Sequence, residues 1–212
     1  MAHAHESTQV KRFGVDDEDR KTSRHDLACQ YLSEPKKAVT PFAPMIKSHC
    51  ELMYKGREKS RCPVIKAKRA QTEYCLTKGE GKYLSTIGFL DVLFTLNAVV
   101  NYYYKKDVPA DGENWPEPAH SEMLPVSLAI EVKASKSSIS EAIRQIELYR
   151  QFYPEKPVAH CFWVLVTLFP ITASERDLLG TAQIWHAQLG DDFEEFCKSH
   201  SATEKIAPQF VL

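Results

Sequence analysis

The chain has 212 residues, enough for a substantial hydrophobic core in one domain. Its formal net charge of −1 gives no overall electrostatic signal for nucleic acid, so any such signal must be local. No apolar run approaches the roughly 18–20 residues of a membrane helix. The six cysteines include no C-x-x-C pair and no short Cys/His cluster, which argues against a structural zinc or iron–sulfur centre. Scattered cysteines suit a reducing compartment, so we expect an intracellular protein, cytoplasmic or nuclear.

The N-terminal residues 1–21 are polar and lack apolar periodicity, which predicts a disordered leader. We expect residues 22–212 to form one domain whose core spans about 44–170. A first helix should end near Leu32, before a connection punctuated by prolines. A second, amphipathic helix is expected over 44–55.

A run of cations covers the end of this second helix and the residues after it: Lys47, Lys55, Arg57, Lys59, Arg61, Lys66, Lys68 and Arg69. Such a run is usually a solvated face. In a protein that binds nucleic acid it would also contact phosphates, and we select Lys66, Lys68 and Arg69 for that role.

A β-hairpin is predicted next. Residues 72–77 alternate and are rich in β-branched and aromatic side chains, 78–82 is a glycine-bearing turn, and 83–96 is the return strand. Residues 97–125 then suggest a long connection. Within it, the tyrosines at 102–104 could stack nucleic-acid bases, but packing of a strand end against the core is the favoured interpretation.

A strand–helix–strand unit follows the connection. Residues 127–135 predict a strand, 138–153 a helix, and 159–169 an apolar strand buried on both faces and parallel to the first. One or two C-terminal helices are expected over 174–200, capped by Thr172 or Ser174. The sum is an α/β fold with a mixed central sheet flanked by helices.

Charged side chains interrupt the apolar strands of this sheet. Asp91 lies in the return strand, and Glu131 and Lys133 project from one face of the strand at 127–135. The helix after it carries Gln145 and Tyr149 at i and i+4. A lone E-x-K is more often an exposed pair on an edge strand. Burying both charges instead costs several kcal/mol unless a partner such as a cation neutralises them.

This order of motifs resembles the PD-(D/E)xK nuclease superfamily, in particular the RecB-like branch with a Q-x-x-x-Y helix. Leu90 stands where the family usually has a proline. The resemblance implies a restriction endonuclease-like αβββαβ core and a nuclease, for which DNA is preferred over RNA as the substrate. Mg²⁺ or Mn²⁺ would be held by Asp91, Glu131 and the carbonyl of Val132, with Lys133 assisting the attacking water.

The resemblance also implies an upstream acidic ligand, for which we choose Glu51, with Glu73 as the rival. Gln145 and Tyr149 would contact the water, the metal shell or the nucleic-acid backbone. At the turn into the helix and on the helix itself, residues that could reach phosphates are Ser135, Lys136 and Arg144.

Two alternatives stay open. The chain could be a catalytically silent nucleic-acid-binding or scaffolding module with the same fold, or an α/β interaction domain in which the E-x-K is coincidental. No separate specificity domain is evident, so a homodimer or a partner protein could supply substrate choice. No P-loop, G-x-S-x-G or G-x-G-x-x-G motif supports another enzyme class.

Overall fold

The structure is a computed structural model that describes six stretches of the chain: 24–52, 58–79, 84–109, 114–136, 139–153 and 160–203. The expected disordered leader at 1–21 lies outside these residues, as do Lys55, Arg57 and most of the turn at 78–82. None of the helices in the described part is both long and apolar enough to cross a membrane.

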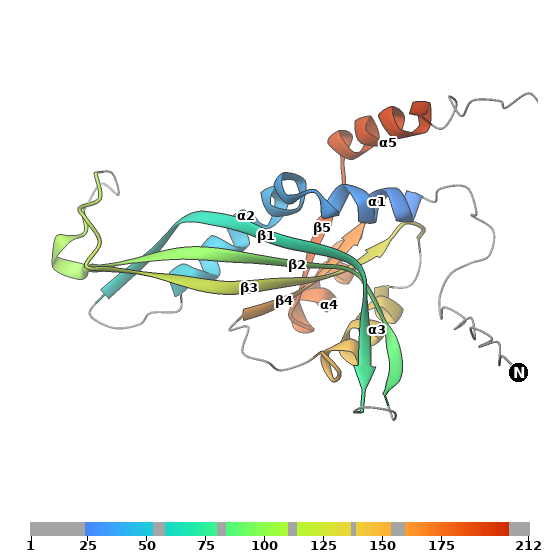
Figure 1. Cartoon of the computed structure of the whole chain (residues 1–212), viewed down its shortest axis with the longest axis horizontal. Helices are drawn as coiled ribbons and strands as arrows, with labels where there is room; N and C mark the ends of the chain where they lie inside the picture. Colours follow the sequence, from blue (N-terminus) through green and yellow to red (C-terminus); the bar gives the residue numbers. More distant parts are fainter. Residues whose placement is uncertain are drawn as a thin grey trace, which may run out of the picture.

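Five strands form one mixed sheet in the order β1-β2-β3-β4-β5, with helices on both faces (Figure 1). β1 (Glu58–Lys78), β2 (Ser85–Tyr104) and β3 (His120–Lys133) pair antiparallel. β4 (His160–Thr167) and β5 (Ile184–Gln188) continue the sheet in parallel with β3. The α/β class and the parallel pairing of β3 with β4 are thereby confirmed.

The first three strands are longer than the sequence predicted. β1 begins at Glu58 rather than at residue 72, and β2 continues to Tyr104. The connection expected over 97–125 is therefore shorter than predicted, because its two ends belong to β2 and β3, and a 3₁₀ turn, η2 (Lys105–Asp107), follows β2. Alternate residues of β2 stay buried beyond Asn97, and this burial outweighs the poor strand propensity of asparagine. Tyr102 is fully buried, as the packing interpretation of the tyrosines expected.

The second N-terminal helix, like the first three strands, is longer than predicted. α1 (Arg24–Ser33) ends where expected, but α2 (Pro35–Leu52) includes the supposed connection and contains Pro41 and Pro44. Proline is well tolerated at the first position of a helix, as at Pro35. The internal prolines each remove an amide donor. Burial of the apolar face of α2, of which Phe42 is fully buried, offsets that loss.

The C-terminal segment contains a strand that the sequence did not reveal. α4 (Ala173–Thr181) is followed by β5 and then by α5 (Asp191–Thr203), where one or two helices were expected. Thr172 caps α4 in a capping box with Glu175, which confirms the predicted cap. β5 escaped prediction because it has five residues and lies at the edge of the sheet.

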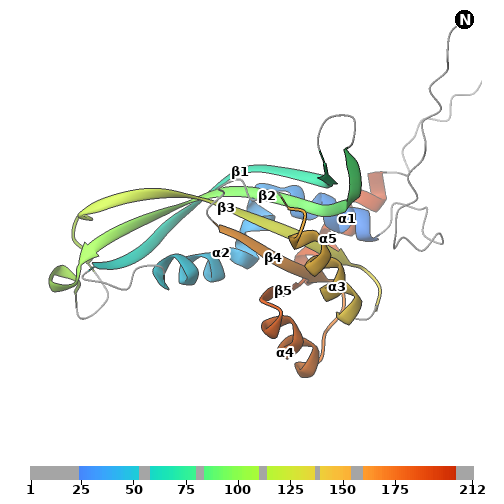
Figure 2. The same cartoon turned by 90° about the horizontal axis from the view of Figure 1, so that it is seen from below.

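Two hydrophobic clusters hold the layers together, one on each face of the sheet. The first packs α1, α2 and α5 against β2, β3 and β4. The second packs α3 (Ile139–Arg150) and α4 against β3, β4 and β5. Figure 2 shows β1, β2 and β3 continuing well past β4 and β5, so that one end of the sheet is only three strands wide.

Candidate active site

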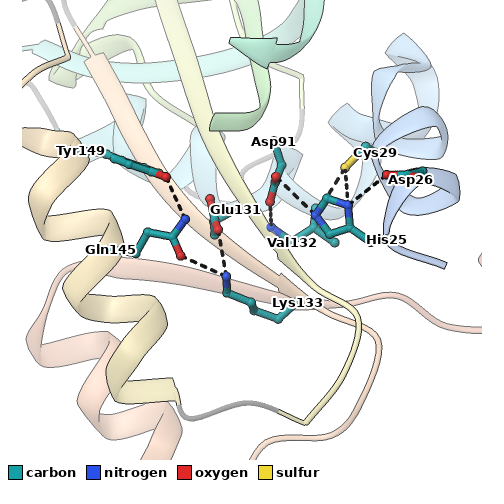
Figure 3. Close-up of polar contacts among 9 residues, drawn as sticks. All are labelled: His25, Asp26, Cys29, Asp91, Glu131, Val132, Lys133, Gln145 and Tyr149. Carbon is teal, nitrogen blue, oxygen red and sulfur yellow. Dashed lines mark hydrogen bonds and ion pairs between the residues drawn. The ribbon is translucent and has the colours of Figure 1, made fainter. Parts of the chain in front are cut away.

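Asp91 and Glu131 come together where the ladder between β2 and β3 ends (Figure 3). The last pair of that ladder is Val92 with Ile130. Just beyond it, Oδ2 of Asp91 accepts a hydrogen bond of 2.7 Å from the amide of Val132. The structure thus brings the two predicted carboxylates and Val132 together. Val132 contacts Asp91 through its backbone amide, whereas its carbonyl was the predicted metal ligand.

Glu131 is a buried carboxylate that the protein compensates only in part. It is 3% exposed, and its Oε1 lies 2.9 Å from Nζ of Lys133. Its Oε2 is buried and has no hydrogen-bond partner among the described residues. Burial and then the charge of Asp91 raise the pKa of Glu131 well above its usual range, against the opposing effect of Lys133.

A hydrogen-bonded chain continues from Lys133 onto α3. Nζ of Lys133 donates to Oε1 of Gln145 over 3.0 Å, and Nε2 of Gln145 donates to the hydroxyl of Tyr149 over 2.8 Å. The ring of Tyr149 packs against Gly88 so closely that a Cβ there would lie 2.7 Å from Cε1 of the tyrosine. Gln145 and Tyr149 are therefore connected to Lys133 of the E-x-K motif, and the absence of a side chain at Gly88 leaves room for the ring of Tyr149.

α1 contributes a histidine and a cysteine that the sequence reasoning missed. Nε2 of His25 lies 3.3 Å from Oδ1 of Asp91, and Sγ of Cys29 lies 3.9 Å from Nδ1 of His25. Donor atoms of these three residues all lie within 4.8 Å of one another. The hydrogen bond to Asp91 is the main cause that raises the pKa of His25 to about 11. The available signal was the i, i+4 spacing of His25 and Cys29 in a predicted helix, and the expectation of no short Cys/His cluster is wrong.

Glu51 does not belong to this site, which corrects the predicted upstream ligand. Glu51 is exposed near the end of α2, where its carbonyl accepts a hydrogen bond from Ser60. Ser60 pairs with Tyr102, eleven residues along β2 from Asp91. At about 3.3 Å per residue, that separation is on the order of 35 Å.

The rival residue Glu73 lies much closer to the carboxylates. Its neighbours in β1, Thr72 and Tyr74, pair with the two neighbours of Asp91 in β2. Glu73 has a φ of 51°, a left-handed backbone conformation that is rare for a residue other than glycine. The structure therefore favours Glu73 over Glu51 as an additional acidic residue.

The predicted phosphate-contacting residues lie on the surface, on β1 and after β3. Lys66, Lys68 and Arg69 are exposed on β1, and Ser135 and Lys136 are exposed directly after β3. Ser138, another residue of that turn, lies outside the described part of the chain.

Arg144 is also on the surface. It is exposed on α3 and forms an ion pair with Glu141 rather than joining the hydrogen-bonded chain of Gln145.

The donor set of the site fits a divalent cation. Two carboxylates, one of them with a buried oxygen that lacks a partner among the described residues, are ligands that Mg²⁺ and Mn²⁺ accept. The ring of His25 beside Asp91 is protonated at neutral pH because its pKa is raised to about 11. It would become a nitrogen donor, of the kind that favours a transition metal, only by losing that proton when the cation binds.

Comparison with known proteins adds no further guide. No family model, curated protein or solved structure matches this chain. Its function must therefore be argued from the site itself.

Proposed function

We propose that this protein is a divalent-metal-dependent nuclease of the PD-(D/E)xK class. The observation that carries the proposal is the buried carboxylate of Glu131, which has one oxygen on Lys133 and the other without a partner among the described residues. A buried charge that is only partly compensated costs several kcal/mol, and a bound cation would offset that cost. The element order of a helix, three antiparallel strands, a helix and a parallel strand agrees with a restriction endonuclease-like αβββαβ core.

Asp91, Glu131 and His25 would hold the cation, which is Mg²⁺ or Mn²⁺, with Mn²⁺ favoured by the imidazole ligand. When bound, such a cation supplies a Lewis acid for the phosphoryl oxygen and lowers the pKa of a coordinated water. Glu73, on β1 next to the β2 segment that carries Asp91, would be the further acidic residue.

The other residues of the site would position charge and hydrogen bonds. The ammonium group of Lys133 lies beside Glu131 and would stabilise negative charge on the phosphoryl group and orient the attacking water. Gln145 holds that ammonium group in place, and Tyr149 fixes the amide of Gln145. Each of these roles follows from a contact of about 3 Å.

The test is a cleavage assay on linear, circular, single-stranded and branched DNA and on RNA. Each substrate is incubated with Mg²⁺, Mn²⁺ or EDTA, and wild type is compared with Glu131→Gln. Cleavage of DNA that requires the metal and is lost in the variant supports the proposal. Absence of cleavage on every substrate, with no change in melting temperature on adding Mn²⁺, would contradict it and favour a silent binding module.

A further inference from the structure

The three-stranded end of the sheet has one face that carries a row of cations. Even-numbered residues of β2 from Val92 to Tyr102 are buried against the first cluster, so the odd-numbered residues point to the opposite face. We call that opposite face the open face. The β1 residues that pair with its β2 positions are Lys59, Arg61, Val64, Lys66 and Arg69.

Two β-bulges in β1 keep the cations on the open face. Between Arg61 and Val64, and again between Ala67 and Arg69, β1 has one residue more than β2. Each extra residue reverses the alternation of side chains. The first bulge therefore turns Lys66 to the open face and Ile65 toward the core, and the second returns Arg69 to the open face.

The open face is free of carboxylates at its paired positions. The β2 and β3 residues that face it with the cations are Thr95, Asn97, Val99, Asn101, Tyr103, Ser121, Met123 and Pro125. None of the four β1 cations forms an ion pair with a carboxylate of the described residues. Below this part of the sheet lies α2, and no helix of the described chain covers the open face (Figure 2).

We infer that the open face binds the phosphate backbone of a DNA duplex and leads it to the active site. This inference rests on the proposed nuclease function and names the surface that holds its substrate. A row of cations without carboxylate partners among the described residues, flanked by amides and hydroxyls, is suited to phosphate oxygens. A second copy of the chain on this face would place cations against cations. Single strands are bound by successive exposed aromatic side chains. On this face Tyr103 is buried, and Lys59 and Arg61 lie over the ring of Trp115 that packs on it.

The register of the strands gives the expected length of the contact. Thr95, Asn97 and Asn101, the partners of Arg69, Lys66 and Arg61, lie four, six and ten residues along β2 from Asp91. Ten residues span about 33 Å at about 3.3 Å per residue, the length of roughly ten base pairs. The duplex is thus held over about ten base pairs on one side of the cleaved bond.

Binding of a labelled DNA duplex in EDTA, followed by fluorescence anisotropy over a series of salt concentrations, tests this inference. The variant is Lys66→Glu with Arg69→Glu, repeated with both residues changed to alanine to show that the effect does not depend on charge reversal. The matched control is Arg176→Glu with Lys198→Glu, an equal charge change at exposed positions of α4 and α5. We expect the open-face variants to weaken binding about tenfold or more. The slope of log affinity against log salt should fall by roughly 1.8, the value for two phosphate contacts.

Several outcomes would overturn the inference. Wild-type affinity in both open-face variants would do so, as would an equal loss in the control. Sedimentation showing that the variants dissociate a dimer while duplex binding is unchanged would assign the face to a second copy instead. Because EDTA prevents metal-dependent cleavage, this binding assay does not depend on the nuclease chemistry. If the protein cleaves DNA but the open-face variants bind the duplex like wild type, only the inference about the open face fails. If the open face binds the duplex but no cleavage occurs with metal, only the proposed nuclease function fails.

Discussion

The two ends of the sheet handle charge in opposite ways. Where β4 and β5 complete the sheet, helices pack on both faces, and Glu131 is buried beside Lys133. Where the sheet is three strands wide, Arg61 and Lys66 are exposed to solvent on the open face. A solvated cation costs little free energy, whereas a buried carboxylate is retained only with a partner. We therefore assign the proposed chemistry to the end that helices cover on both faces, the covered end, and the proposed binding to the three-stranded end.

The largest expected effect is at the covered end. Lys133→Met should reduce cleavage by about 10²–10³-fold, because it removes a preorganised charge at the phosphoryl group. Lys198→Met, on α5, removes an exposed lysine that has no assigned role and serves as the control. Initial rates of DNA cleavage in Mn²⁺ measure both variants, and equal losses would show that general charge rather than the position of Lys133 matters.

His25 should set the metal affinity. We expect His25→Ala to raise the Mn²⁺ concentration for half-maximal cleavage about 10–100-fold, the range reported for residues that support a metal site. His200→Ala, on α5, should leave it unchanged. If His25→Ala and wild type need the same Mn²⁺ concentration for half-maximal cleavage, the imidazole is not a metal ligand.

Gly88 tests whether Tyr149 must hold its present position. Gly88→Ala should disrupt the Gln145–Tyr149 contact, since the new Cβ would overlap the tyrosine ring, and should destabilise the fold by about 1–3 kcal/mol. Gly180→Ala is the matched control, because no atom lies within 4 Å of a Cβ at that position. Thermal unfolding and cleavage rates distinguish the two, and identical behaviour would contradict the close packing at Gly88.

The smallest effect concerns stability and pH. Burial raises the pKa of Glu131 in the folded protein above its unfolded value, so between those two pKa values the folded state holds a proton that the unfolded state lacks. Stability therefore falls as pH rises through that window. In EDTA at pH 8, Glu131→Gln should melt about 2–4 °C above wild type, equivalent to about 1 kcal/mol, and the difference should shrink toward pH 5. A variant that melts below wild type at pH 8 would contradict the cost assigned to this carboxylate.

Much of the site could be predicted from local sequence. Asp91, Glu131 and Lys133 are conspicuous because charges in apolar strands are expensive. Gln145 and Tyr149 were selected because they match the Q-x-x-x-Y helix that the resemblance implies, and helical spacing places them on one face. The contact of His25 with Asp91 is different, because it joins an N-terminal helix to a distant strand and depends on how α1 packs on the sheet.

The errors have a common physical origin in tertiary burial. Asn97 and the prolines of α2 were interpreted as ends of elements, although buried neighbours extend both the strand and the helix past them. The longer α2 and the longer strands place Glu51 beside Ser60 in the three-stranded end, away from Asp91. The pairing partners of a residue, which sequence alone did not supply, decided which glutamate lies near the site.

The most direct test of the central claim is calorimetric titration of the protein with Mn²⁺. Wild type is compared with Glu131→Gln and with Glu122→Gln, a control on β3 in which the altered carboxylate accepts a hydrogen bond from Tyr102. The account predicts saturable binding in wild type and the control, and its loss in Glu131→Gln. Equal binding in all three proteins, or no binding in wild type, would contradict a metal centre at Glu131.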